Sequence, residues 1–422
     1  MKPDKPIVTS QLNRDFYDFT VWQLANRFHP DVPVTLQFIN RSTHERLGDM
    51  LDLGRLREEL DEARRVPFNP NDLQDLMGIC EYDRPMFSIA DIRALEKVRL
   101  PEYELGKTKD GQLDLRFHGP WPSVLFWENP SMQIPNHLRS EYLMGDRSRF
   151  ERKLVYAEGR LRLGQKIKEL RKYPDIKFSD FGTRRSFNHK WHQEVVETLM
   201  LECGDQFVGT SNVFLAKHLA RKHKREVMPM GTNNHGMVMV YNGIYHTQDD
   251  VDPTFSSRKV LEDWESIHGD ALTIFLSDTW SSPWFFKNVV TDDMLRRWKG
   301  FRHDSGSPIV YGKDRIAGYK KLDVDPMKKI SLFADGNTVT KMIDIRNYFY
   351  RLLNYTFGWG TDESNDLGFP TASIVTKPIF VNGIPVCKLS DNIKKASGDP
   401  RAIERVKKLI GYDNTFEEVC TF

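Results

Sequence analysis

The feature that most constrains the fold is a recurring unit, a short apolar run that ends abruptly in a polar, glycine-containing turn. From about residue 175 it occurs seven times, in the segments IKFSDFGTRR, QFVGTSN, VMPMGTNNH, LTIFLSDTW, FRHDSG, ISLFADGN and YTFGWGTDES. Stretches with helical patterning, such as 193–201 and 339–353, separate these units. Apolar strand, polar turn and helix in repetition are typical of a parallel α/β sheet or barrel, in which ligands bind at the carboxyl ends of the strands. The pattern therefore predicts one site shared by the seven turns. A Rossmann fold is disfavoured because no strand leads into G-x-G-x-x-G.

The composition narrows the class of protein without choosing a function. The 422 residues suffice for two or three domains, or for one large barrel with an appendage, and 39% of them are hydrophobic. The longest apolar stretches are far too short to span a bilayer, and the opening MKPDKPIVTSQ has no apolar signal core. A formal net charge of +2 gives no general reason to expect a nucleic-acid or membrane partner.

The four cysteines are Cys80, Cys203, Cys387 and Cys420, and they are widely scattered without the spacing of metal ligands. This usage argues against a disulfide scaffold or a zinc ribbon and favours a reducing compartment. We therefore expect a cytoplasmic protein of enzyme size.

The segments before and after the repeated units have a different pattern. Before them we expect a helix over 12–27 with Asp15 exposed near its start, strands over 34–39, 113–117 and 123–127, a charged amphipathic helix over 51–65, and a mostly helical stretch over 139–170. After Pro370, two alternating runs flank Asn382-Gly383, which predicts a hairpin, and a short basic helix follows over 399–411. The expected organisation is an amino-terminal α/β domain over 1–145, a barrel over 146–370, and a segment over 371–422 that returns to the first domain.

Three of the turns combine glycine with threonine, at 209–212, 231–234 and 358–361. Glycine lets the backbone approach an oxyanion, and hydroxyl and N–H groups donate hydrogen bonds to it. Three such turns at one mouth indicate a ligand with more than one phosphate or carboxylate, although ordinary loop chemistry explains any single turn equally well.

Charged side chains accompany these turns. Arginine can bind phosphate or carboxylate through two donors. The candidates are Arg184, Arg185 and Arg302, and the alternative role for each is a salt bridge at the rim of the site. Carboxylates beside phosphate-binding turns suit Mg²⁺ or ribose hydroxyls, and a pair of them could equally cleave a glycosidic bond; the candidates are Asp180, Asp278, Asp304 and Asp335.

His235 follows one of the glycine-threonine turns, where a neutral imidazole could act as a base or a nucleophile. A structural histidine is the alternative. The basic run KHLARKHKR over 217–225 could form a nucleic-acid patch in a nucleotide-sensing or nucleic-acid module. No aromatic residue interrupts it, so the solvated face of a barrel helix is the favoured interpretation.

Taken together, the motifs resemble those of the nicotinate phosphoribosyltransferase family. They are FSDFGTRR, FVGTSN, PMGTNNH, LSDTW, FRHDSGSP, FADGN and FGWGT, and the resemblance extends from DFY near residue 15 to KLS at 388–390. The resemblance implies the type II phosphoribosyltransferase fold, an irregular parallel α/β barrel with an α/β sandwich built from the amino- and carboxyl-terminal parts. It also implies transfer of a phosphoribosyl group from 5-phosphoribosyl 1-pyrophosphate to nicotinate, the first step of NAD biosynthesis from that base. Related enzymes that use nicotinamide or quinolinate are the alternatives.

The resemblance assigns roles to individual residues. Phe181 and Tyr17 resemble the aromatic pair around the pyridine ring, with Tyr17 coming from a partner subunit, which implies a homodimer with shared active sites. Arg184 and Arg302 match arginines near the substrate carboxyl and the sugar phosphates. Asp304 matches a carboxylate near the ribose. The remaining positions in the base and phosphoribosyl sites are Thr210, Asp278, Asp335, Gly336, Gly358, Gly360 and Thr361.

Two positions bear on substrate and energy coupling. The related nicotinamide enzyme has an acidic residue at the position of Ser211, and a carboxylate there would repel nicotinate, so Ser211 favours the acid over the amide. His235 matches the family's phosphorylated histidine, which implies ATP as co-substrate and Mg²⁺ with ATP and phosphoribosyl pyrophosphate. The chain departs from the family at Asn234, Gly236 and Ser307, where Ala, Glu and an acid are usual.

Overall fold

The computed structural model describes residues 6–81, 83–246 and 253–418, so Cys420 lies outside the described residues. Its central element is a seven-stranded parallel sheet with the strand order β8-β7-β6-β12-β11-β10-β9. The strands are β6 (Phe178–Asp180), β7 (Phe207–Thr210), β8 (Met228–Pro229), β9 (Ile274–Leu276), β10 (Gly300–His303), β11 (Ile330–Phe333) and β12 (Asn354–Trp359). Each of the seven predicted apolar runs forms one of these strands. The predicted parallel α/β architecture is therefore confirmed.

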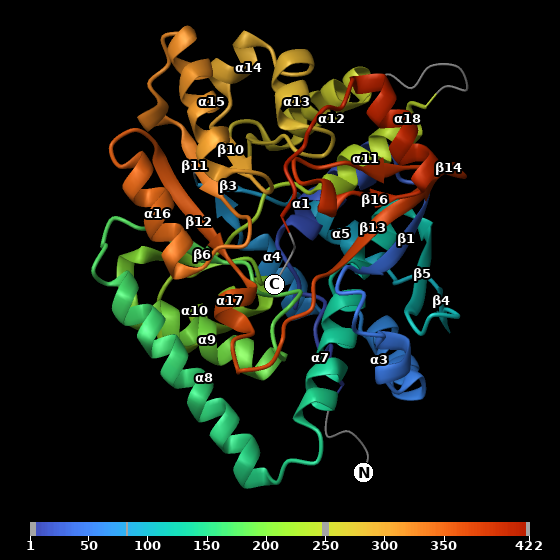
Figure 1. Ribbon diagram of the computed structural model, residues 1–422. Helices are drawn as coiled ribbons and strands as arrows, with labels where there is room; N and C mark the ends of the chain where they lie inside the picture. Colours follow the sequence, from blue (N-terminus) through green and yellow to red (C-terminus); the bar gives the residue numbers. More distant parts are fainter. Residues whose placement is uncertain (1–5, 82, 247–252, 419–422) are drawn as a thin grey trace.

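The sheet curls into a half-barrel (Figure 1). Within the described residues its edge strands β8 and β9 pair only with β7 and β10. The gap between the edges is crossed by a side chain, since Asn233 Nδ2 donates to the carbonyl of Ile274 at 3.0 Å. The expected barrel is thus open along one side.

A row of phenylalanines explains why such short strands hold together. Phe207, Phe178, Phe357 and Phe333 occupy matching register positions on β7, β6, β12 and β11. All four side chains are buried, and neighbouring rings lie 6.0 Å apart for Phe178 and Phe207 and 6.1 Å apart for Phe333 and Phe357. Buried aromatic area is a large apolar contribution per residue, so three- or four-residue strands suffice here.

One helix precedes the first strand of the half-barrel, and the others follow its strands. They are α8 (Arg149–Leu170), α9 (His189–Glu202), α10 (Val213–His223), α11 (His235–Ile244), α12 (Pro253–His268), α13 (Ser282–Asn288), α14 (Asp292–Arg297), α15 (Pro308–Lys321), α16 (Val339–Phe349) and α17 (Thr361–Ser364). Several polar turn residues cap these helices: Asn212 Oδ1 accepts from the Leu215 N–H at 3.0 Å, and Asn234 Oδ1 accepts from the Met237 N–H at 2.9 Å. Part of the polar character of the turns is therefore helix capping.

A second sheet is antiparallel and joins distant parts of the chain, with the order β14-β13-β1-β5-β4. Its strands are β1 (Pro33–Asn40), β4 (Tyr103–Lys107), β5 (Leu113–Pro120), β13 (Ile374–Val381) and β14 (Ile384–Pro385). Asn382 and Gly383 both have positive φ angles, 51° and 77°, so the predicted hairpin is confirmed. Because β13 pairs with β1, the carboxyl-terminal segment returns to the amino-terminal unit. The exact domain boundaries stay a prediction.

The remaining elements surround this sheet and complete the chain. They are α1 (Tyr17–Phe28), α2 (Leu47–Met50), α3 (Leu53–Arg65), α4 (Pro70–Met77), β2 (Cys80–Glu81), β3 (Arg84–Pro85), α5 (Ile89–Lys97), α6 (Trp121–Val124), α7 (Pro130–Met144), β15 (Cys387–Lys388), β16 (Ser397–Gly398) and α18 (Pro400–Ile410). The basic helix predicted at 399–411 is α18, capped by Asp399. In the described part of the chain no helix combines the length and apolarity needed to cross a membrane.

The expected strand over 123–127 was wrong. Residues 123–127 form the end of α6 and a 3₁₀ turn rather than a strand. Val124, Leu125, Phe126 and Trp127 are all buried, and a short run that is apolar on every side carries no periodicity to separate helix from strand. The stretch 139–170 is mostly helical, as predicted, and it is divided between α7 and α8 at Gly145, whose φ angle is 53°.

Candidate active site

A cavity of about 480 Å³ opens at the carboxyl ends of the parallel strands. Six of the seven turns line it directly, and the seventh, after β9, supplies Asp278 behind the wall. The predicted convergence of the turns is therefore confirmed. Among the candidate residues proposed from the sequence, thirteen line the cavity: Tyr17, Phe181, Arg184, Arg185, Ser211, His235, Arg302, Asp304, Asp335, Gly336, Gly358, Gly360 and Thr361.

The two aromatic residues proposed for the base site lie in the same cavity of one chain. Phe181 follows β6, and its ring packs against Gly358, where a Cβ atom would come within 2.5 Å of the ring. Only glycine permits that ring position, which gives Gly358 a packing role in the free protein. Tyr17 begins α1 and approaches the turn after β8. The expectation that a partner subunit supplies Tyr17 is therefore corrected, because the chain's own Tyr17 occupies the cavity.

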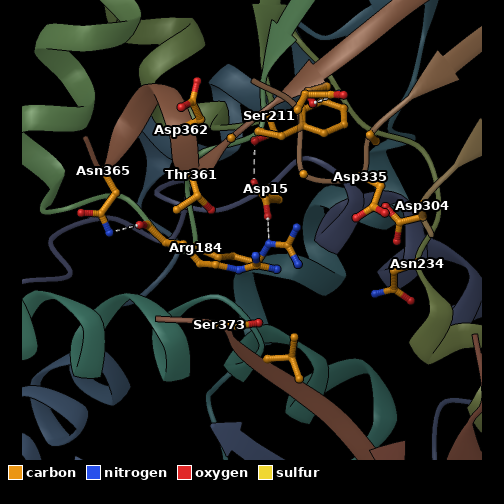
Figure 2. A pocket seen from close by; sticks show the side chains of 18 of the residues that line it. Asp15, Arg184, Ser211, Asn234, Asp304, Asp335, Thr361, Asp362, Asn365 and Ser373 are labelled. Atoms are coloured by element: carbon orange, nitrogen blue, oxygen red, sulfur yellow. Dashed lines mark hydrogen bonds and ion pairs between the residues drawn. The ribbon is translucent and has the colours of Figure 1, made fainter. Parts of the chain in front are cut away.

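Arg184 projects into the middle of the cavity (Figure 2). Its Nε lies 2.8 Å from Asp15 Oδ2, and its guanidinium carbon lies 5.4 Å from the centre of the Tyr17 ring. The nearby anionic groups raise the pKa of Arg184 despite its burial, which alone would lower that pKa. This arginine stays charged beside the aromatic pair.

Asp15 is the largest departure from the sequence-based expectations at the site. It was expected to be exposed, yet only 1% of its surface is accessible. Its Oδ1 accepts a hydrogen bond from Ser211 Oγ at 2.6 Å. The local sequence gave no signal of this burial, because the residues that enclose Asp15 come from the turns after β6 and β7.

His235, at the start of α11, is held by side chains from two neighbouring turns. Nδ1 lies 3.0 Å from Thr279 Oγ1, and Nε2 lies 2.8 Å from Asp304 Oδ2 and 3.6 Å from Asp278 Oδ1. Burial first, and then the charge of Lys388, lower the pKa of His235 to about 4 against the pull of the two aspartates. The imidazole is therefore neutral at pH 7, and one ring nitrogen keeps a lone pair for nucleophilic chemistry.

Asp278 lies behind the histidine in a buried network. Its Oδ2 accepts from Lys388 Nζ at 3.1 Å, from Ser305 Oγ at 2.5 Å and from Ser390 Oγ at 3.3 Å. Although burial alone would raise it, the pKa of Asp278 is lowered by Lys388 and His235. Asp278 is thus an ionised carboxylate beside His235. The sequence analysis assigned it to the phosphoribosyl site, but it does not line the cavity.

Four cations reach the cavity from the antiparallel sheet and the carboxyl-terminal segment, and the sequence reasoning named none of them. They are Arg41, Lys377, Lys388 and Lys395. Lys395 Nζ pairs with Asp335 and donates to the Asp304 carbonyl at 2.9 Å, and Lys377 Nζ pairs with Glu128 at 2.9 Å. The motif KLS at 388–390 was noticed, but only the returning tail shows that its lysine enters the site.

Thr210 does not line the cavity. Its hydroxyl donates to Asp180, a fully buried carboxylate that also accepts from His192 Nε2 at 2.9 Å and from the Gly182 N–H at 2.7 Å. Thr210 therefore supports the floor of the site. The basic run at 217–225 lies mostly on α10, where Arg221 pairs with Asp75 and Lys222 with Glu197. These contacts fit a solvated helix face.

His235, Asp278 and Asp304 place possible metal-ligand atoms within 4.8 Å of one another. Magnesium prefers oxygen ligands, however, and the Lys388 ammonium already neutralises Asp278. The donor set therefore suits a resident magnesium ion poorly.

Glu363 on α17 is a second buried carboxyl, and it lies close enough to Asp180 to feel the charge of that carboxylate. Burial and the Asp180 charge raise its pKa well above the usual value, so folding favours the protonated carboxyl over the ionised one. Its contribution to stability is complete below its unfolded pKa and is lost as the pH rises towards its folded pKa. Glu363→Gln should therefore raise the unfolding free energy at pH 8 by about 1–3 kcal/mol, with less gain at pH 5.

Thermal unfolding of both proteins across this pH range measures the effect. Glu59→Gln is the matched control, because the buried Glu59 carboxylate accepts from Arg55 Nε at 3.0 Å and from the Ile7 N–H at 2.8 Å. That variant should lose stability at both pH values. A Glu363→Gln protein that is less stable than the wild type at pH 8 would contradict the protonated state.

The parallel half-barrel and the cation-rich cavity at its strand ends define an α/β enzyme for a phosphorylated or carboxylated ligand. Family models identify it further: the nicotinate phosphoribosyltransferase (NAPRTase) N-terminal domain matches residues 12–136, and the nicotinate phosphoribosyltransferase (NAPRTase) family matches residues 176–414. The chain belongs to the nicotinate phosphoribosyltransferase family, which is a family of enzymes.

Solved structures agree with this assignment. The chain is similar to the nicotinate phosphoribosyltransferase of Porphyromonas gingivalis, with 25% identity, a TM-score of 0.83 and coverage of 96% of this chain and 100% of that one. It is similar to the Vibrio cholerae enzyme, with 26% identity, a TM-score of 0.84 and coverage of 97% and 95%. A putative nicotinate phosphoribosyltransferase of Saccharomyces cerevisiae shares the fold, with 24% identity, a TM-score of 0.80 and coverage of 97% and 100%.

Proposed function

We propose that this enzyme transfers the phosphoribosyl group of 5-phosphoribosyl 1-pyrophosphate to the ring nitrogen of nicotinate. The products are nicotinate mononucleotide and pyrophosphate, and the reaction is the first step of NAD biosynthesis from nicotinate. The observation that carries the proposal is the joint presence, in one cavity, of an aromatic pair, a central arginine and a set of lysines. Tyr17 and Phe181 suit a flat ring, Arg184 suits its carboxylate, and Lys388 and Lys395 suit phosphates.

In this proposal, different residues of the cavity bind the base and the diphosphate. The aromatic pair and Arg184 orient the base so that its ring nitrogen faces the sugar carbon. The new carbon–nitrogen bond forms as the bond to pyrophosphate breaks, and positive charge develops on the ribose during that step. Asp304 lies where a carboxylate can contact the ribose, and the lysines stabilise the departing diphosphate.

ATP coupling through His235 is the second part of the proposal. The lowered pKa keeps the imidazole neutral, so a ring nitrogen can attack the γ-phosphorus while the bond to ADP breaks. The Asp304 carboxylate accepts the N–H of Nε2, which leaves the lone pair on Nδ1 as the attacking nitrogen. As the Nδ1–phosphorus bond forms, Asp304 can take the proton from Nε2. Magnesium is expected to enter with ATP and the diphosphate substrate rather than as a resident ion. Association of two chains into a homodimer also remains a proposal.

The direct test combines the protein, Mg²⁺ and phosphoribosyl pyrophosphate with nicotinate, nicotinamide or quinolinate. We expect nicotinate mononucleotide and pyrophosphate from nicotinate alone, without release of CO₂. If the protein forms mononucleotide from nicotinamide in preference to nicotinate, the assignment of the base is wrong. Release of CO₂ with quinolinate would favour the quinolinate-using enzyme. If no base gives a mononucleotide, the proposed transfer is wrong.

A further inference from the structure

Asp15 is fixed in the cavity wall by the backbone around it. The Phe16 N–H donates to the Ser211 carbonyl at 2.7 Å, and the Val213 N–H donates to the Arg14 carbonyl at 3.1 Å. A bridge between Asp15 and Asn212 lies between these contacts. The segment before α1 is therefore pinned against the turn after β7, and the carboxylate of Asp15 cannot leave the site without breaking these contacts.

The carboxylate of Asp15 uses both oxygens on site residues, as the dashed lines in Figure 2 show. Oδ1 accepts from Ser211 Oγ at 2.6 Å, and Oδ2 lies 2.8 Å from Arg184 Nε. The side chain of Asp15 is 2% exposed, whereas that of Arg184 is 25% exposed. Asp15 therefore contacts the guanidinium of Arg184 at Nε, and the Nη side of this guanidinium faces the cavity.

This arrangement leaves the outer donors of Arg184 available. In the part of the chain that the structure describes, the Arg184 Nη atoms make no hydrogen bond, and Asp15 is the ion-pair partner of this side chain. Two Nη donors in one plane match the two oxygens of a carboxylate, whereas an amide would turn its NH₂ group towards one of them. The guanidinium also lies against the Tyr17 ring, so a substituent on a ring bound there falls within its reach.

We propose that Asp15 is a positioning residue that gives the enzyme its preference for a carboxylate-bearing base by fixing the orientation of Arg184. This inference rests on the proposed function and deepens it. It also changes the role of Ser211, whose hydroxyl hydrogen goes to Asp15 instead of to the substrate. With one oxygen occupied by Ser211 and the other by Arg184, Asp15 does not present an unpaired carboxylate to an incoming carboxylate.

The test is the ratio of kcat/KM for nicotinate to kcat/KM for nicotinamide. Asp15→Asn keeps the shape but loses the charge that holds Nε, so the ratio should fall by about tenfold or more, chiefly through a higher KM for nicotinate. The KM for phosphoribosyl pyrophosphate should change little. Asp15→Glu, which keeps the charge, should recover part of the ratio, and Ser211→Ala should lower it by a smaller factor.

A double-variant comparison separates positioning from a structural role. If Asp15 acts through Arg184, adding Asp15→Asn to Arg184→Gln should not lower the ratio further. Asp18→Asn is the matched control: Asp18 is also buried, pairs with Arg14 and Asn129, and lies outside the cavity, so it should affect stability without altering the ratio. An unchanged ratio in a folded Asp15→Asn protein, or additive losses with Arg184→Gln, would overturn the proposal while leaving the proposed function intact. A wild-type protein inactive with every base would overturn both.

Discussion

His235→Asn should abolish labelling of the protein by [γ-³²P]ATP and the stimulation of product formation by ATP. The asparagine amide can keep hydrogen bonds to Thr279 and Asp304, but it offers no imidazole nitrogen for a bond to phosphorus. The ATP-dependent part of the rate should fall by more than about 100-fold. Transfer in the absence of ATP should stay within about tenfold of the wild type, because the base and diphosphate contacts remain.

The measurements are acid-labile ³²P incorporation and the rate of mononucleotide formation with and without ATP. His268→Asn provides a matched control, since His268 is another buried histidine, its pKa is also lowered to about 4 by burial, and it lies outside the cavity. Labelling should persist in that variant. Equal ATP stimulation of His235→Asn and wild type would rule out the phosphohistidine.

Lys388→Met should weaken both the fold and the chemistry at His235. It leaves the buried Asp278 carboxylate without its ammonium partner, which costs about 3–5 kcal/mol of unfolding free energy. It also removes the second cause of the low pKa of His235, so that pKa should rise. Because attack requires a neutral imidazole, the acid limb of the ATP-dependent rate should move to higher pH.

Denaturant unfolding and the pH profile of the ATP-dependent rate measure the two effects. Lys394→Met changes an exposed lysine in the same segment that pairs with Glu417, so it should cost less than about 1 kcal/mol and leave the profile in place. Lys388→Met combined with Asp278→Asn removes both buried charges and should regain much of the lost stability. A Lys388→Met protein as stable as the wild type would show that the pair is not needed to keep Asp278 buried.

Features that depend on a few consecutive residues could be predicted from the sequence, and features that depend on contacts between distant segments could not. The seven strands and their convergence were predictable because an apolar run, its turn and the following helix are encoded within a few consecutive residues. The hairpin at Asn382 and Gly383 was predictable for the same reason. The region at 123–127 was not, since burial on every side removes the alternation that marks a strand.

The parts of the site that the sequence analysis did not predict depend on contacts between distant segments. The Asp15 carboxylate is buried by Ser211, which is 196 positions away along the chain. The lysines of the carboxyl-terminal segment enter the cavity only because β13 pairs with β1 and the tail then passes over the strand ends. Family resemblance supplied Tyr17 and Phe181, but only the structure places both in the cavity of one chain.

The pairing of β1 with β13 also has a consequence for synthesis on the ribosome. Arg41, directly after β1, donates to the carbonyl of Lys395, a contact across 354 positions of sequence. The half-barrel can begin to form as its units emerge, but the cavity lacks its lysines until residues 377–395 have left the exit tunnel. A nascent chain would therefore hold His235 without Lys388 beside it until the segment that carries this lysine has been synthesised.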